Sequence, residues 1–108
     1  MCEDSQIVIP RSFVELFIAP GRSRPSQTRA VIAARHELCE DMATLLTEQA
    51  LLKRFELGVD ESVVLERVHR GLLADGAGLS SAEAGWVVHR LAELLGWPQP
   101  QQQPAADG

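Results

Sequence analysis

The chain has no tyrosine, few aromatic residues and only two cysteines, and each shortage excludes something. With aromatics at 5% of 108 residues, leucine, valine and alanine must supply most of any core. Cys2 and Cys39 do not make a disulfide framework, so we expect a reduced, cytoplasmic setting. No run approaches the roughly 20 apolar residues of a membrane span, and the acidic start lacks the pattern of a signal peptide.

The charge balance lacks a basic excess. Fifteen acidic residues outnumber ten basic ones, which gives a formal net charge of −5. This balance argues against nucleic acid or an anionic membrane surface as a partner. The chain also has no Walker A motif and no sheet pattern to carry one. We therefore predict no nucleotide hydrolysis, no catalytic residues and no cofactor.

One uninterrupted stretch, from Ser26 to about Phe55, organises the rest of the chain. Ser26 suits a helix N-cap, and Gly58 suits the left-handed residue that ends a helix. Between them, apolar residues recur at three- and four-residue steps, which predicts a long helix with one inward face. The predicted inward residues are Val31, Ala34, Leu38, Met42, Leu45, Leu46 and Leu52.

The far end of this helix breaks the pattern, because Leu51 and Phe55 fall on the side opposite the inward face. A straight helix over residues 26–57 would span roughly 48 Å at 1.5 Å per residue. A compact domain of this size has a radius of gyration of only about 13 Å. The helix must therefore either bend near Gln49 or extend beyond its own domain toward a partner.

Three further helices are predicted, over about residues 10–19, 60–74 and 81–95. The first is apolar on nearly every side, and the last begins with the capping-box spacing of Ser80 and Glu83 and ends at Gly96. The fold class is therefore all-α, a small helical bundle with one long central helix and a short apolar N-terminal helix. We predict a single helical domain over residues 1–97, with residues 1–6 loose, and a disordered Pro/Gln-rich tail over residues 98–108.

The inward faces of the last two helices follow from the same periodicity. For residues 60–74 the predicted inward residues are Val64, Leu65, Val68 and Leu72. For residues 81–95 they are Ala84, Val87, Val88, Leu91, Leu94 and Leu95.

Two groups of side chains on the long helix have the types that carry chemistry. A possible zinc set comprises His36, Cys39 and either His69 or His89. A carboxylate set comprises Glu37, Glu40 and Asp41. Acid–base work needs such carboxylates partly desolvated in a pocket, whereas these are predicted to face solvent. A solvated histidine, a half-buried cysteine and a solvated acidic face are the simpler interpretation, so we predict no metal site.

Arginines gather where the long helix begins. Arg22 and Arg24 lie in a turn-rich loop, and Arg29 follows in the first turn of the helix. Because helix N-termini favour anions, these residues support an alternative function as a binder of phosphate or another anionic ligand. The loop lacks the Gly-Lys-Ser/Thr ending of a P-loop, and a soluble turn that pairs with acidic groups explains it more simply.

Several stretches resemble a group of small uncharacterised proteobacterial proteins. They are IPRSFVELF at 9–17, PGR at 20–22, LCEDM at 38–42 and WVVHRLAELLGW at 86–97. Some members of that group carry the label "ATPase with chaperone activity". The resemblance implies an all-helical fold and an association with protein-remodelling machinery. We do not transfer ATPase activity, because this chain has neither a Walker A motif nor a Walker B strand.

The apolar residues that no core accounts for predict a partner chain. An apolar N-terminal helix cannot turn every side to one core, and Trp86 lies off the inward face of the last helix, where it either anchors an interface or packs within the chain. The leading hypothesis is a cytoplasmic interaction module without catalytic activity that forms a homodimer, binds another protein, or does both. The predicted interface residues are Phe13, Leu16, Phe17, Leu51, Phe55 and Trp86.

Overall fold

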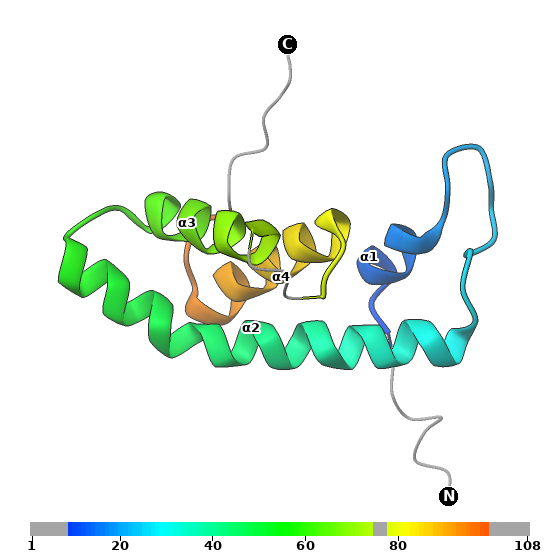
Figure 1. Cartoon of the computed structure of the whole chain (residues 1–108), viewed down its shortest axis with the longest axis horizontal. Helices are drawn as coiled ribbons and strands as arrows, with labels where there is room; N and C mark the ends of the chain where they lie inside the picture. Colours follow the sequence, from blue (N-terminus) through cyan, green and yellow to red (C-terminus); the bar gives the residue numbers. More distant parts are fainter. Residues whose placement is uncertain (1–8, 75–77, 100–108) are drawn as a thin grey trace, which may run out of the picture. The chain divides into compact units, whose positions relative to one another are not determined.

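The computed structural model describes residues 9–74 and 78–99. Over these residues the chain forms α1 (Arg11–Val14), the 3-10 turn η2 (Glu15–Phe17), α2 (Arg29–Leu57), α3 (Glu61–Ala74) and α4 (Ser81–Leu95), and no strand (Figure 1). The all-α prediction is therefore confirmed. The loose start predicted for residues 1–6, and all of the predicted tail beyond Gln99, lie outside the described residues.

The chain divides into two compact units, Met1–Leu38 and Cys39–Gly108, with the boundary inside α2. The first unit comprises α1, η2 and the first part of α2. The second comprises the rest of α2 with α3 and α4. The prediction that residues 1–97 make a single domain stays a prediction.

The first unit is built around Phe13, which is 0% exposed. Its ring centre lies 5.5 Å from that of Phe17 and 5.3 Å from that of His36. The amide of Ser26 donates to the carbonyl of Phe17 at 2.7 Å, which returns the intervening loop to the end of η2. The N-terminal helix, predicted over about residues 10–19, is shorter in the structure. Its α-helical part is Arg11–Val14, and Glu15–Phe17 form a 3-10 turn.

The long helix begins three residues later than predicted, and Thr28 caps it. The amide of Val31 donates to Thr28 Oγ1 at 3.2 Å, and the amide of Ile32 donates to the Thr28 carbonyl at 3.0 Å. The prediction of Ser26 as the cap was therefore wrong, because Thr28 directly precedes the helix and its hydroxyl accepts from the first turn. Gly58 ends the helix as predicted, with φ +65 and its amide donating to the Arg54 carbonyl at 2.9 Å.

In the second unit, α3 and α4 contact each other, and each is tied to α2 by an ion pair. Arg54 lies 3.4 Å from Glu61 at the start of α3, and Arg90 of α4 lies 2.8 Å from Glu40. The predicted inward residues of α3 are buried or half-buried, and those of α4 are too, except for Leu94. The apolar core of this unit comprises Cys39, Ala43, Ala50, Val64, Leu65, Leu72, Ala84, Val87, Val88, Leu91 and Ala92.

Both ends of α4 match the local prediction. The Glu83 amide donates to Ser80 Oγ at 3.0 Å, and the Ser80 amide donates to Glu83 Oε1 at 2.9 Å, so the capping box is complete. Gly96 adopts φ 72, and the amide of Trp97 donates to the Ala92 carbonyl at 2.9 Å. This pattern is a Schellman motif, which satisfies carbonyls that the helix leaves without partners.

The predicted inward face of α2 is wrong. The buried residues of α2 are Ile32, Cys39, Ala43 and Ala50, about a third of a turn round the helix from the predicted stripe. Leu45, at the centre of that stripe, is 72% exposed. The buried positions beyond Ile32 carry small side chains, and small side chains let neighbouring helices approach closely. The prediction from periodicity and hydrophobicity placed the larger apolar residues on the buried face instead.

Candidate interaction surface

The last two turns of α2, residues 51–57, form a tip at the C-terminal end of the helix. All seven residues of this α2 tip are exposed. They include Leu51 at 52%, Leu52 at 55% and Phe55 at 85%. Leaving such large apolar side chains in water forgoes their burial energy, so a cluster of them is a candidate interaction site.

Leu45 extends this apolar cluster by two turns. At 100° per residue, Leu45, Leu51, Leu52 and Phe55 lie within an arc of about 120° on the side of α2 away from Ala43 and Ala50. We call these four residues the outer face. Leu45 and Leu52 are seven residues apart, and Val31 and Leu38 continue that spacing toward the N-terminus. A seven-residue repeat of this kind is typical of a helix that packs against another helix. The sequence-based prediction included these residues but assigned them to the core of the chain itself.

A groove of about 540 Å³ lies on another side of the same tip, between α2 and α3. Its apolar lining comes from Leu46, Leu57, Val64, Val68 and Leu72. Gly71 also lines it and leaves space there, because it has no side chain. Lys53 and Arg67 bring positive charge to the lining. Sequence reasoning missed this groove, which depends on how α2 and α3 are spaced.

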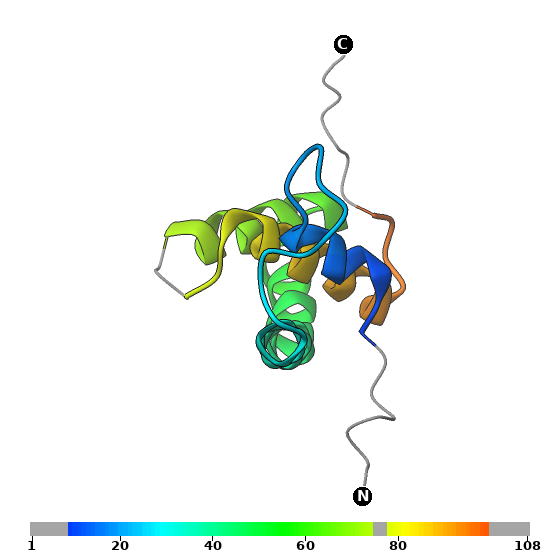
Figure 2. The same ribbon diagram turned by 90° about the vertical axis from the view of Figure 1, so that its right-hand side faces the viewer.

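The curvature of α2 does not hide the tip. In both views the green, C-terminal part of α2 turns toward α3 (Figures 1 and 2). Thr44 Oγ1 donates to the Glu40 carbonyl at 3.0 Å, and Thr47 Oγ1 donates to the Thr44 carbonyl at 2.7 Å. Such hydroxyl bonds to the preceding turn often bend helices. The bend that we considered near Gln49 as an alternative to a partner therefore leaves Leu51 and Phe55 exposed.

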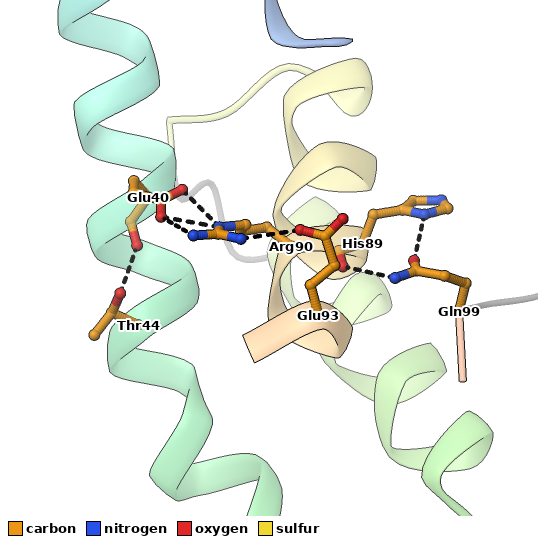
Figure 3. A network of polar contacts seen from close by, with 6 residues as sticks. All are labelled: Glu40, Thr44, His89, Arg90, Glu93 and Gln99. Carbon is orange, nitrogen blue, oxygen red and sulfur yellow. Dashed lines mark hydrogen bonds and ion pairs between the residues drawn. The ribbon is translucent and has the colours of Figure 1, made fainter. Parts of the chain in front are cut away.

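Arg90 fixes α4 against α2 through a network of polar contacts (Figure 3). Its Nε donates to both carboxylate oxygens of Glu40 at 2.9 and 3.0 Å, and its Nη1 donates to Glu93 Oε1 at 3.0 Å. The hydrogen bond to Glu40 raises the pKa of Arg90 most, and the hydrogen bond to Glu93 raises it further. The arrangement neutralises the guanidinium with two carboxylates, so it suits a structural tie.

The beginning of the predicted tail also contacts α4. His89 Nδ1 and Gln99 Oε1 are 2.7 Å apart, and Gln99 Nε2 donates to the His89 carbonyl at 3.4 Å (Figure 3). This pairing holds the chain just after the Schellman motif. Of the predicted tail, Pro98 and Gln99 are the described part.

The six predicted interface residues have different surroundings. Leu51 and Phe55 are exposed, whereas Leu16, Phe17 and Trp86 are half-buried. Phe13 is buried, and its ring contacts with Phe17 and His36 lie within its own unit. The exposed pair therefore supplies the accessible part of the predicted interface.

The predicted anion-binding arginines do not converge on one hollow. Arg22, Arg24 and Arg29 are all exposed. Arg22 lines a hollow of about 690 Å³ with Arg11 and Ser23, whereas Arg29 lines a different hollow of about 290 Å³. The larger hollow also includes Glu15, which is paired with Arg11 at 3.2 Å. A carboxylate there lowers the attraction for an anion.

The residues weighed for a metal site have ordinary packing roles. His36 lies edge-on to Phe13, and Cys39 is buried in the core of the second unit. Over residues 9–74 and 78–99, no group of three or more His, Cys, Asp or Glu side chains is placed to hold a metal ion. In the same part of the chain, no helix has both the length and the apolar character to cross a membrane.

Comparisons with known proteins leave this surface to be interpreted from its own residues. No family model matches the chain, and neither the curated proteins nor the solved structures contain a match. The interpretation therefore depends on the exposure, charge and geometry of the second unit.

Proposed function

We propose that this protein is a small cytoplasmic interaction module without catalytic activity, and that it self-associates through the outer face of α2. The observation that carries the proposal is the exposure of Phe55, at 85%, beside Leu45, Leu51 and Leu52. These four side chains lie on one side of a well-formed helix, so a partner can cover them together. A homodimer is the simplest assembly of this kind.

The burial energy of the outer face is comparable to the cost of association. Full burial of one such side chain is worth about 1.5–3 kcal/mol. Scaled by their exposed fractions, the outer faces of two copies offer about 8–16 kcal/mol. Association costs about 4–15 kcal/mol in lost freedom and ordering. The two ranges overlap, so self-association requires that most of the outer face be covered.

Sedimentation equilibrium of wild-type protein against two variants tests this proposal. Phe55→Glu places a charge in the centre of the outer face, and we expect it to weaken association at least about a hundredfold, or roughly 2.7 kcal/mol. Leu73→Glu is the matched control, because Leu73 is an exposed leucine of α3 that lies outside both the outer face and the groove. A monomer mass for the wild-type protein at micromolar concentration would refute the proposal, as would equal effects of the two variants.

Two other functions have less support. An anion binder using Arg22 and Arg24 would be favoured by the hollow that Arg22 and Arg11 line, but Glu15 opposes it. A rise in melting temperature with inorganic phosphate, lost in Arg22→Ala, would support that function. A partner from protein-remodelling machinery is what the resemblance to the proteobacterial group implies, and it would compete for the same outer face.

A further inference from the structure

The groove between α2 and α3 is positively charged in a chain whose net charge is negative. Among the described residues that line it, Lys53 and Arg67 carry charge and none is acidic. Neither makes an ion pair within the described part of the chain, and both are exposed. The groove is therefore suited to an apolar segment flanked by carboxylates.

The outer face of α2 is a segment of that kind. Asp41 and Glu48 fall within its arc, and Glu56 lies at its edge. All three carboxylates are exposed. Between Cys39 and Leu57, no basic residue of α2 falls in that arc. The outer face thus combines four large apolar side chains with three carboxylates, which matches the apolar lining and the two cations of the groove.

We infer that the groove of one copy receives the outer face of α2 from a second copy. This inference rests on the proposed self-association and names the surface that the outer face binds. If two outer faces paired with each other instead, their six carboxylates would share one interface, and like charges in contact oppose association. Pairing with the groove brings Glu48 and its acidic neighbours toward Lys53 and Arg67.

The geometry makes this assembly head-to-tail. Four residues of α2 line the groove: Leu46, Gln49, Lys53 and Leu57. Viewed along the helix axis, their mean direction is about 145° from that of the outer face. A copy whose outer face fills a neighbour's groove therefore still presents its own groove to a third copy. Contacts between two unlike surfaces continue until a ring closes or a filament forms. The assembly is then not limited to the two-fold dimer that the sequence suggested.

Gly71 allows the groove to be closed without damage to the fold. A Cβ at this position would meet no atom within 4 Å, and its φ is not among the positive values of the chain. Gly71→Leu should therefore fill the groove from α3 and also suit the helix better than glycine does. The double variant Lys53→Glu/Arg67→Glu provides a second test, since it reverses the charge of the groove and leaves its shape alone.

Mixing two variants tests the inference. Phe55→Glu keeps an open groove, and Gly71→Leu keeps an intact outer face, so each lacks a different half of the contact. By analytical ultracentrifugation at micromolar concentration, we expect wild-type protein to grow beyond a dimer and each variant alone to be a monomer. The equimolar mixture should form a one-to-one dimer that grows no further, and added salt should weaken it.

Three outcomes decide between the possibilities. If Gly71→Leu alone associates like wild-type protein while Phe55→Glu does not, outer faces pair with each other, and the inference is wrong although the proposed function stands. If wild-type protein is a monomer, both are wrong. If Lys53→Glu/Arg67→Glu associates as tightly as wild-type protein, the charge argument fails. Each variant must also give a far-UV circular dichroism spectrum like that of wild-type protein and unfold cooperatively, which shows that it is folded.

Discussion

The helix α4 and the part of α2 from Cys39 onward belong to the same unit. The helix α4 buries its large apolar residues, whereas this part of α2 exposes several of its own. In α4, Val87, Val88 and Leu91 are buried. In α2, the buried positions of this unit are Cys39, Ala43 and Ala50, while Leu45, Leu51, Leu52 and Phe55 face outward. The difference shows that α4 packs through its large residues, whereas α2 packs through small residues and leaves large ones exposed.

The largest effect should come from shortening a leucine on each helix. Leu91→Ala leaves a cavity in α4, where the side chain is 0% exposed, and should cost about 2–5 kcal/mol. Leu45→Ala on α2 should cost less than about 0.5 kcal/mol in a monomer, because its side chain is already in water. Urea unfolding of both variants in the Phe55→Glu background, which removes association, measures the difference. Similar losses would mean that the outer face is part of the core.

Enlarging an alanine should reverse the roles of the two helices. Ala50→Leu forces three extra carbons into a position that is 0% exposed and should cost about 1–3 kcal/mol. Ala82→Leu makes the same change at an exposed position in the first turn of α4, and it should be nearly neutral. Thermal unfolding compares the two. A neutral Ala50→Leu would show that α2 does not need small residues to pack.

The smallest effect concerns the polar tie between the two helices. Arg90→Ala removes the guanidinium that both Glu40 and Glu93 accept from, and should cost about 1 kcal/mol. Arg70→Ala is the control, since its pair with Glu66 at 2.9 Å is more exposed and should contribute only a few tenths of a kcal/mol. Equal losses in urea unfolding would mean that the Arg90 network is an ordinary surface pair.

The pH dependence of that loss follows from the raised pKa of Arg90. A basic group whose pKa is higher in the folded state stabilises the protein fully below the unfolded pKa, and the contribution is lost only when the pH rises through the folded value. Both values for arginine lie far above neutral. The stability difference between Arg90→Ala and wild-type protein should therefore be constant from about pH 6 to pH 9. A clear decline within that range would assign the difference to another group.

Part of the candidate surface could be predicted from the residues alone. The departure of Leu51 and Phe55 from the helical stripe predicted that they meet a surface other than the core face of the helix, either a partner or, after a bend near Gln49, the chain itself, because a break in periodicity marks the point where the packing surface changes. The outer position of Leu45 could not be predicted, because two sides of α2 carry apolar residues and hydropathy favours the side with leucines. The groove could not be predicted from the sequence either, because it depends on the distance between α2 and α3 at Gly71.

By itself, the sequence determined the all-α class, the approximate helices and the ends of α4. These are local properties: the capping box of Ser80 and Glu83 and the Schellman motif at Gly96 each need only a few neighbouring residues. The tertiary structure decided which side of α2 is buried and which residue caps it. Burial depends on how closely other helices approach, and that distance is set by all the side chains at the contact together. In α2 the small side chains of Cys39, Ala43 and Ala50 are buried, whereas Leu45, Leu51, Leu52 and Phe55 are left exposed.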